Sequence, residues 1–143
     1  MIMLNNWTWP KFLSLLEQLL KGTGTTLEVF ALTLLFAIPL GLLVAFARMS
    51  SNPILRIPTK LYILIMRGTP LMLQIMFVYF APSNIFEGFN LDRFAAAIIA
   101  FVLNYAAYFA EIFRGGIASI DKDQYEAATV LGYTKVQTFF KII

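Results

Sequence analysis

The sequence contains no cysteine and no histidine in its 143 residues. Their absence excludes disulfide bonds, thiol nucleophiles, imidazole metal ligands and a Ser-His-Asp catalytic triad. Charged residues make up only 13% of the chain, and no loop gathers the eight acidic side chains at the spacing of metal ligands. We therefore predict that the chain is not an enzyme and that it holds neither a metal nor another cofactor.

Hydrophobic residues are abundant and form 59% of the chain. Soluble domains average about 45–50%, and a helix of about 20 apolar residues crosses the ~30 Å hydrocarbon layer of a bilayer. The composition predicts an all-α membrane protein with several spans in the lipid bilayer. The net charge of +3 comes from lysines and arginines in the loops, so it does not favour a nucleic-acid partner.

The N-terminal part of the chain carries apolar residues at helical spacing from Trp9 onward, with charged residues on the other face. Thr8 suits the N-cap, and Pro10 suits the first turn, where a missing N–H costs nothing. We predict a helix over residues 8–21 that either lies at the membrane interface or packs on the protein's own spans. Gly22-Thr23-Gly24 is predicted to end it.

Three apolar stretches follow, and two of them are simple to delimit. The first predicted span covers residues 27–47, where Gly41 permits close contact between helices. The third predicted span covers residues 94–113. Its first half contains small residues that suit tight helix packing in lipid, namely Ala95, Ala96, Ala97 and Ala100.

The second predicted span covers residues 70–85 and begins at Arg67-Gly68-Thr69-Pro70. Thr69 is predicted to be the N-cap, and Pro70 the first helical residue. An alternative starts this span at Leu61 and leaves the Arg67 side chain at the interface. Ahead of it, Pro53 to Met66 is predicted to form an amphipathic helix along the membrane face.

The distribution of basic residues predicts the orientation of the chain. The stretch from Arg48 to Arg67 holds four basic residues and no acidic one, so the positive-inside rule places it in the cytoplasm. With three crossings, the N-terminus lies outside and the C-terminal region inside. Eight of the eleven Lys and Arg residues are then cytoplasmic: Arg48, Arg56, Lys60, Arg67, Arg114, Lys122, Lys135 and Lys141.

Asn104, Tyr108 and Glu111 share one face of the third predicted span, because they are spaced i, i+4 and i+7. Polar side chains inside a bilayer normally face the protein interior or a water-filled path. Asn104 and Tyr108 are therefore candidates for lining a translocation path. Glu111 lies near the cytoplasmic end and is predicted to pair with Arg114 in a structural role.

Residues 121–143 are predicted to form a cytoplasmic hairpin of two helices. Asp121 or Asp123 caps the first helix, Ala127 and Ala128 give it a flat face, and Gly132 supplies the left-handed residue that ends it. The second helix has an apolar stripe to bury, formed by Val136, Phe139, Phe140 and Ile143.

Three motifs occur here in a characteristic order. They are Arg67-Gly68-Thr69-Pro70-Leu71, the stretch from Asn104 to Ile117, and Glu126-Ala127-Ala128 with Gly132 four residues later. Together they resemble the membrane permease subunits of bacterial ABC importers, and most of all the polar amino acid uptake group. The resemblance covers the chain from about Leu16 onward. We therefore predict that residues 1–143 form a single, partial permease domain.

The resemblance implies one half of an import channel in the bacterial inner membrane. In this family, the segment matching Glu126, Ala127, Ala128 and Gly132 forms coupling helices that dock on a separate ABC ATPase. A second permease subunit, identical or paralogous, completes the channel, and an extracytoplasmic amino acid-binding protein delivers the solute. The residues Arg67, Gly68, Thr69, Pro70, Glu111 and Arg114 match the family's structural motifs.

The chain departs from the family pattern in two places. Asp121 and Asp123 replace the proline and glycine that family members commonly have before the Glu-Ala-Ala motif. The family also continues beyond the position of Ile143 for roughly two more spans, which predicts that this chain is C-terminally incomplete. Two alternatives therefore stay open: a small self-contained transporter or channel, and a structural or non-functional truncated membrane fragment. The chain has no G-x-x-x-x-G-K-[ST] loop, so any ATP hydrolysis belongs to a partner.

Overall fold

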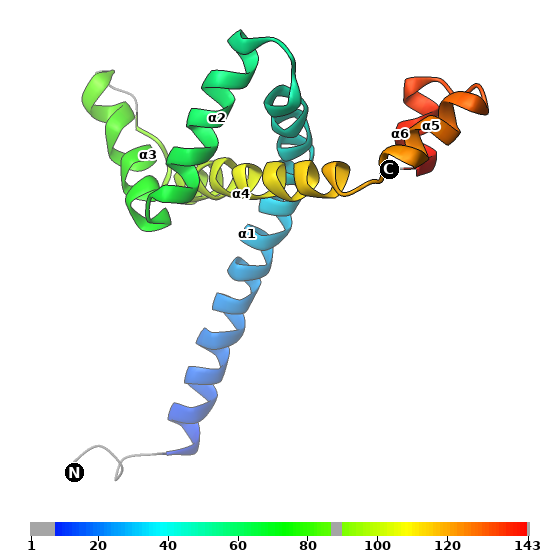
Figure 1. Cartoon of the computed structure of the whole chain (residues 1–143). Helices are drawn as coiled ribbons and strands as arrows, with labels where there is room; N and C mark the ends of the chain where they lie inside the picture. Colours follow the sequence, from blue (N-terminus) through cyan, green and yellow to red (C-terminus); the bar gives the residue numbers. More distant parts are fainter. Residues whose placement is uncertain (1–7, 87–89, 143) are drawn as a thin grey trace.

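The computed structural model describes residues 8–86 and 90–142, and all regular structure within these ranges is helical (Figure 1). The predicted all-α class is confirmed. The six helices are α1 (Trp9–Met49), α2 (Pro53–Gly68), α3 (Leu71–Ile85), α4 (Arg93–Ala118), α5 (Lys122–Val130) and α6 (Lys135–Ile142).

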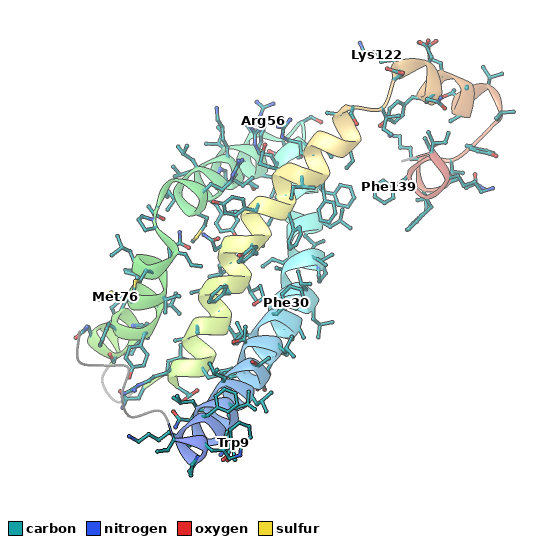
Figure 2. The ribbon with its side chains drawn as sticks, turned by 90° about the horizontal axis from the view of Figure 1, so that it is seen from below. Trp9, Phe30, Arg56, Met76, Lys122 and Phe139 are labelled. Carbon is teal, nitrogen blue, oxygen red and sulfur yellow. The ribbon has the colours of Figure 1, made fainter. Side chains whose placement is uncertain are left out.

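Two helices, α1 and α4, are each long and apolar enough to cross a membrane. Helices α2 and α3 pass the same test only as a pair, and they are bent by 111° at the break between them. The structure thus offers two crossings, or three if the bent pair forms one. Helices α1 and α4 contact each other, and in Figure 2 both run from the Trp9 end of the molecule toward the Arg56 end, so the chain returns between them through α2 and α3.

Helix α1 corrects the prediction of a separate N-terminal helix over residues 8–21. It continues through Gly22-Thr23-Gly24 without a break, so the predicted end there is wrong. The hydroxyl of Thr23 donates to the carbonyl of Leu19 at 2.8 Å, and that of Thr26 to the carbonyl of Gly22 at 2.9 Å. Each glycine costs a helix only about 1 kcal/mol, which is too little to end it without a proline or a cap. At ~1.5 Å per residue, the 41 residues of α1 are about twice as long as the hydrocarbon layer is thick.

The junction of α2 and α3 corrects the predicted start of the second span. Thr69 is not an N-cap: it closes α2, and its hydroxyl donates back to the carbonyl of Ile65 at 2.8 Å. Pro70 occupies the N-cap position of α3, which begins at Leu71. The ring of a proline forces the preceding residue into an extended conformation, and Thr69 accordingly has φ −116° and ψ 146°. The amphipathic helix predicted from Pro53 is confirmed as α2. The alternative start of the span at Leu61 lies within α2, so it corresponds to the case in which the bent pair α2–α3 forms one crossing.

A seam of small residues holds α1 against α4. Every fourth residue of α1 from position 33 to position 45 is buried, and the set consists of Thr33, Ala37, Gly41 and Ala45. A Cβ atom built on Gly41 would lie 2.6 Å from Cβ of Phe109 and 3.1 Å from the carbonyl oxygen of Ala106. Helix α4 contributes buried alanines of its own, namely Ala96, Ala100, Ala106, Ala107 and Ala110, and of these Ala106 and Ala110 lie beside Gly41. The close approach predicted for Gly41 is therefore confirmed.

Helix α4 begins at a clear cap and is longer than the predicted span. The carboxylate of Asp92 accepts hydrogen bonds from the backbone N–H groups of Phe94 at 2.9 Å and Ala95 at 3.3 Å. From there α4 runs unbroken to Ala118, five residues beyond the predicted end at residue 113. The C-terminal hairpin, formed by α5, α6 and the turn between them, lies beyond this end of α4 (Figure 1).

Candidate functional site

The first helix of the C-terminal hairpin ends in a rigid turn. Gly132 has φ +73°, so the left-handed conformation predicted for it is confirmed. The N–H of Tyr133 donates to the carbonyl of Ala128, and the N–H of Gly132 to that of Thr129, both at 3.0 Å. These two bonds form a Schellman motif. No atom outside its own neighbours lies within 4 Å of a Cβ built on Gly132, so the backbone conformation alone demands glycine here.

The two hairpin helices differ in how they begin. Asp121 occupies the N-cap of α5 as predicted, but its carboxylate makes no capping hydrogen bond. The start of α6 carries a full capping box that the sequence reading overlooked. The N–H of Thr134 donates to Oε1 of Gln137 at 2.9 Å, and the N–H of Gln137 donates to Oγ1 of Thr134 at 3.3 Å. The signal was present in the sequence as Thr-x-x-Gln.

The predicted docking residues are divided between the surface and the interior of the hairpin. Glu126 and Ala127 are exposed, whereas Ala128 is only 1% exposed. On α6, the ring of Phe139 packs against Phe46 of α1 with 5.5 Å between ring centroids. Val136 and Phe140 from the predicted apolar stripe remain exposed, and Ile143 lies outside the described residues. The hairpin therefore presents Glu126 and Ala127 outward while Phe139 ties it to the body.

A polar cluster joins α4 to the elbow, which is the segment from Gly68 to Leu71 between α2 and α3. The Nδ2 group of Asn104 donates to the carbonyl of Met66 at 2.9 Å and to Oε1 of Gln74 at 3.0 Å. Nε2 of Gln74 donates to the same Met66 carbonyl at 3.0 Å and to Oγ1 of Thr69 at 2.7 Å. The sequence analysis did not predict a role for Gln74. Its partner Asn104 is 30 positions away, so the spacing of residues within one helix gives no sign of the contact.

Pro70 explains why the Met66 carbonyl needs these donors. In a continuous helix that carbonyl would accept the N–H of the residue four positions later, which is Pro70 and has no N–H. In a membrane, a backbone group freed in this way has to be satisfied by neighbouring side chains or water. Asn104, which is only 5% exposed, and Gln74 supply both donors.

This cluster makes a testable prediction about the stability of the chain. Replacing Asn104 by alanine leaves Oε1 of Gln74 without the donor that it has in the structure, and replacing Gln74 by alanine has the reciprocal effect. Hydrogen bonds between helices in membranes are worth about 0.6 kcal/mol and at most about 1.7 kcal/mol. We expect a coupling energy of that size in a double-mutant cycle of unfolding in sodium dodecyl sulfate. Asn84→Ala, which removes only a local bond to Phe80, should add independently to Gln74→Ala, and equal coupling for both pairs would contradict the cluster.

Tyr108 and Glu111, the other residues of α4 that share the predicted face, lie one and two helical turns beyond Asn104 toward the hairpin. The guanidinium of Arg67 lies over the ring of Tyr108, 5.3 Å from its centroid. Oε2 of Glu111 accepts from Nε of Arg114 at 2.9 Å and from Nη2 at 2.8 Å, which confirms the predicted pair. Oε1 of Glu111 also lies 3.9 Å from Nε of Arg48 at the end of α1. The face of α4 that carries Tyr108 and Glu111 therefore contacts both α1 and α2.

Comparison with known proteins gives consistent matches. Residues 37–143 match the family described as binding-protein-dependent transport system inner membrane component. The chain is 39% identical over 132 residues to the probable amino-acid ABC transporter permease protein PatM of Vibrio harveyi, and these residues cover 92% of this chain and 59% of that protein. It is 35% identical over 135 residues to the glutamine transport system permease protein GlnP of Escherichia coli (strain K12), covering 94% of this chain and 62% of that protein.

A solved structure also matches. The chain aligns with the crystal structure of an amino acid ABC transporter with histidines at a TM-score of 0.81 and 30% sequence identity, covering 94% of this chain and 62% of that one. The chain thus spans about three-fifths of the length of these relatives. By its sequence and its helical arrangement, the chain belongs to the family of binding-protein-dependent transport system inner membrane components.

Proposed function

We propose that the chain forms part of the membrane-spanning permease subunit of an ATP-driven importer of polar amino acids. The names of the relatives, which include amino-acid and glutamine permeases, support this solute class. The proposal places the N-terminus outside and the C-terminal hairpin in the cytoplasm, with eight of the eleven basic residues on the cytoplasmic side. Its partners are an ABC ATPase, a second permease subunit and an extracytoplasmic amino acid-binding protein.

In this proposal the C-terminal hairpin is the part that docks on the ATPase. Glu126 and Ala127 form the exposed contact surface of α5, and Gly132 with its two backbone bonds keeps α5 at a fixed angle to α6. A capped and rigid hairpin transmits displacement, whereas a flexible one would absorb it. Movement of the ATPase would therefore be passed to the end of α4.

The observation that carries the proposal is the continuity of α4. One unbroken helix of 26 residues connects Asn104 at the elbow with the start of the hairpin. Displacement of its cytoplasmic end therefore acts on the bent pair α2–α3 through the Asn104–Gln74 cluster. We assign to this cluster the positioning of the elbow beside the solute path.

Purification from detergent separates this function from a self-contained transporter or channel. We expect the chain, expressed with an ABC ATPase from the same cells, to be recovered as a stable complex with it. The complex should fall apart when residues 121–142 are deleted, because the deletion removes both hairpin helices. A monodisperse chain that never retains the ATPase, yet conducts solute in liposomes, would favour the alternative.

Charge reversal at Glu126 tests the docking surface itself. Glu126→Lys is expected to weaken the affinity for the ATPase by about 5–30-fold, since losing a charge contact and creating a repulsive one costs roughly 1–2 kcal/mol. The matched control is Glu17→Lys, which makes the same change at an exposed site of α1 on the proposed outer side. Microscale thermophoresis with the purified ATPase measures both, and an equal loss in the two variants would contradict a local contact at Glu126.

A further inference from the structure

A groove rich in basic residues lies between the C-terminal end of α1, helix α2 and helix α4. Its cavity volume is about 360 Å³. We call it the basic groove, and its charged and aromatic lining consists of Arg48, Lys60, Arg67, Tyr108 and Glu111. Three cations thus surround a single carboxylate, and neither the elbow cluster nor the docking surface uses this site.

The carboxylate does not neutralise these three cations. Glu111 directs Oε2 to Arg114 at 2.8 Å, and its other oxygen is 3.9 Å from Arg48. Lys60 and Arg67 form no ion pair with any described residue of the chain. Arg67 is instead held in place by the Tyr108 ring at 5.3 Å. Like charges gathered in one groove repel, and an anion placed between them relieves that repulsion.

The chemistry of the lining suits a phosphate group. A guanidinium presents a planar fork of donors that matches phosphate oxygens, and a lysine ammonium adds a point charge. Arg67 is already oriented by its ring contact, so less side-chain freedom is lost on binding. Gly68 also lines the groove, and a Cβ built on it meets nothing within 4 Å, so the space beside Arg67 is open.

The surroundings of the basic groove indicate the source of the phosphate. Next to it, α2 exposes an apolar face to which Ile57, Leu61 and Leu64 contribute at spacings of four and three residues. Leu64 lines the groove and is also 67% exposed, so the charged and apolar surfaces are continuous. An amphiphile with an anionic head and apolar tails contacts both surfaces, whereas a soluble phosphate contacts only the first.

We propose that the basic groove binds the phosphate headgroup of one anionic phospholipid, with its acyl chains along the exposed apolar face of α2. In the orientation proposed above, this lipid belongs to the cytoplasmic leaflet. Basic pockets between spanning helices on that side are suited to anionic headgroups. The lipid would hold α1, α2 and α4 together at the end from which the hairpin extends.

Native mass spectrometry of the delipidated chain, titrated with phosphatidylglycerol or phosphatidylcholine, tests the proposal. We expect one phosphatidylglycerol to bind at least about tenfold more tightly than phosphatidylcholine, since each basic residue near an anionic lipid is worth roughly a fivefold change in affinity. Lys60→Gln and Arg67→Gln should each weaken phosphatidylglycerol binding about fivefold. Lys60 is exposed and unpaired among the described residues, so Lys60→Gln should leave the helical circular dichroism unchanged.

Arg56→Gln is the matched control, because it removes the same charge from the same helix at a position that does not line the basic groove. It should leave the affinity for phosphatidylglycerol unchanged. An equal loss in Arg56→Gln would show general attraction to a basic surface and overturn the site. Displacement of phosphatidylglycerol by inorganic phosphate at equal concentration would assign the groove to a soluble anion, and equal binding of the two lipids would also overturn the proposal.

Discussion

Gly132→Val is expected to uncouple ATP hydrolysis from amino acid uptake in the assembled transporter. The residue has φ +73°, a conformation that costs an L-residue with a side chain roughly 1–2 kcal/mol and a β-branched residue more. Because a Cβ at this position meets no atom within 4 Å beyond its chain neighbours, the expected cost comes from the backbone conformation. A free-energy loss of 1–2 kcal/mol changes a local equilibrium about 5–30-fold.

The direct readout is amide hydrogen exchange in the chain itself. The N–H groups of residues 132 and 133 close the Schellman turn, and in Gly132→Val we expect both to exchange about 5–30-fold faster. In proteoliposomes that contain the ATPase and the binding protein, ATP hydrolysis should continue while uptake for each ATP hydrolysed falls several-fold. A loosened hairpin can still contact the ATPase but no longer transmits its displacement.

Gly132→Asn provides the matched control. Asparagine adds a side chain of a size similar to valine but tolerates the left-handed conformation far better. It should retain most of the protection against exchange and most of the uptake. If valine and asparagine reduce uptake equally, side-chain volume at the ATPase contact is responsible, and the assigned backbone role is wrong. Full uptake with valine would contradict the coupling role of the hairpin.

The sequence was informative wherever one local feature determined the structure. Gly132 had to be left-handed at a helix end, Glu111 and Arg114 were one turn apart on one helix, and Gly41 was a small residue within a long apolar run. Each of these predictions depended on a few neighbouring residues, and the structure confirms each of them. Their roles in transport remain predictions.

Predictions failed where two weak local signals competed or where the partner was distant in sequence. Gly22 and Gly24 suggested a helix end, but the helix continues through both of them, because a cost of about 1 kcal/mol for each glycine does not stop the propagation of a long helix. Thr69 and Pro70 suggested the start of a helix, and α3 does begin at Leu71, but the cap is Pro70 and Thr69 ends the preceding helix. The Asn104–Gln74 cluster joins residues 30 positions apart, and no periodicity within either helix predicts such a contact.

These corrections bear directly on the coupling mechanism. With a single unbroken helix in α1 and another in α4, the small-residue seam between them is the largest contact of the body. Both helices end at the side where the hairpin lies, and Phe46 of α1 touches Phe139 of α6 there. The seam therefore fixes the position from which the hairpin would be moved in the proposed coupling mechanism.

Among the glycines that the structure describes, Gly41 alone has atoms of another helix within 4 Å of a built Cβ, and its replacement is expected to have the largest effect on stability. A Cβ would lie 2.6 Å from Cβ of Phe109 and 3.1 Å from the backbone oxygen of Ala106. Neither atom belongs to the free end of a flexible side chain, so α4 as a whole has to move. We expect Gly41→Ala to destabilise the chain by about 1–3 kcal/mol and Gly41→Ile by more, in line with overpacking in tightly packed cores.

Unfolding in sodium dodecyl sulfate, followed by circular dichroism, measures this loss. The control is Gly22→Ala in the same helix, where a Cβ meets nothing within 4 Å. It should be neutral or stabilising by up to about 1 kcal/mol, because alanine is the better helix former. The chain has no native cysteine, so spin labels on cysteines introduced at the exposed positions Leu43 and Ile112 report the separation of α1 and α4 without background. If Gly41→Ala is as stable as Gly22→Ala and leaves that separation unchanged, the seam does not hold the two helices, and the hairpin must be positioned by the α2–α3 elbow alone.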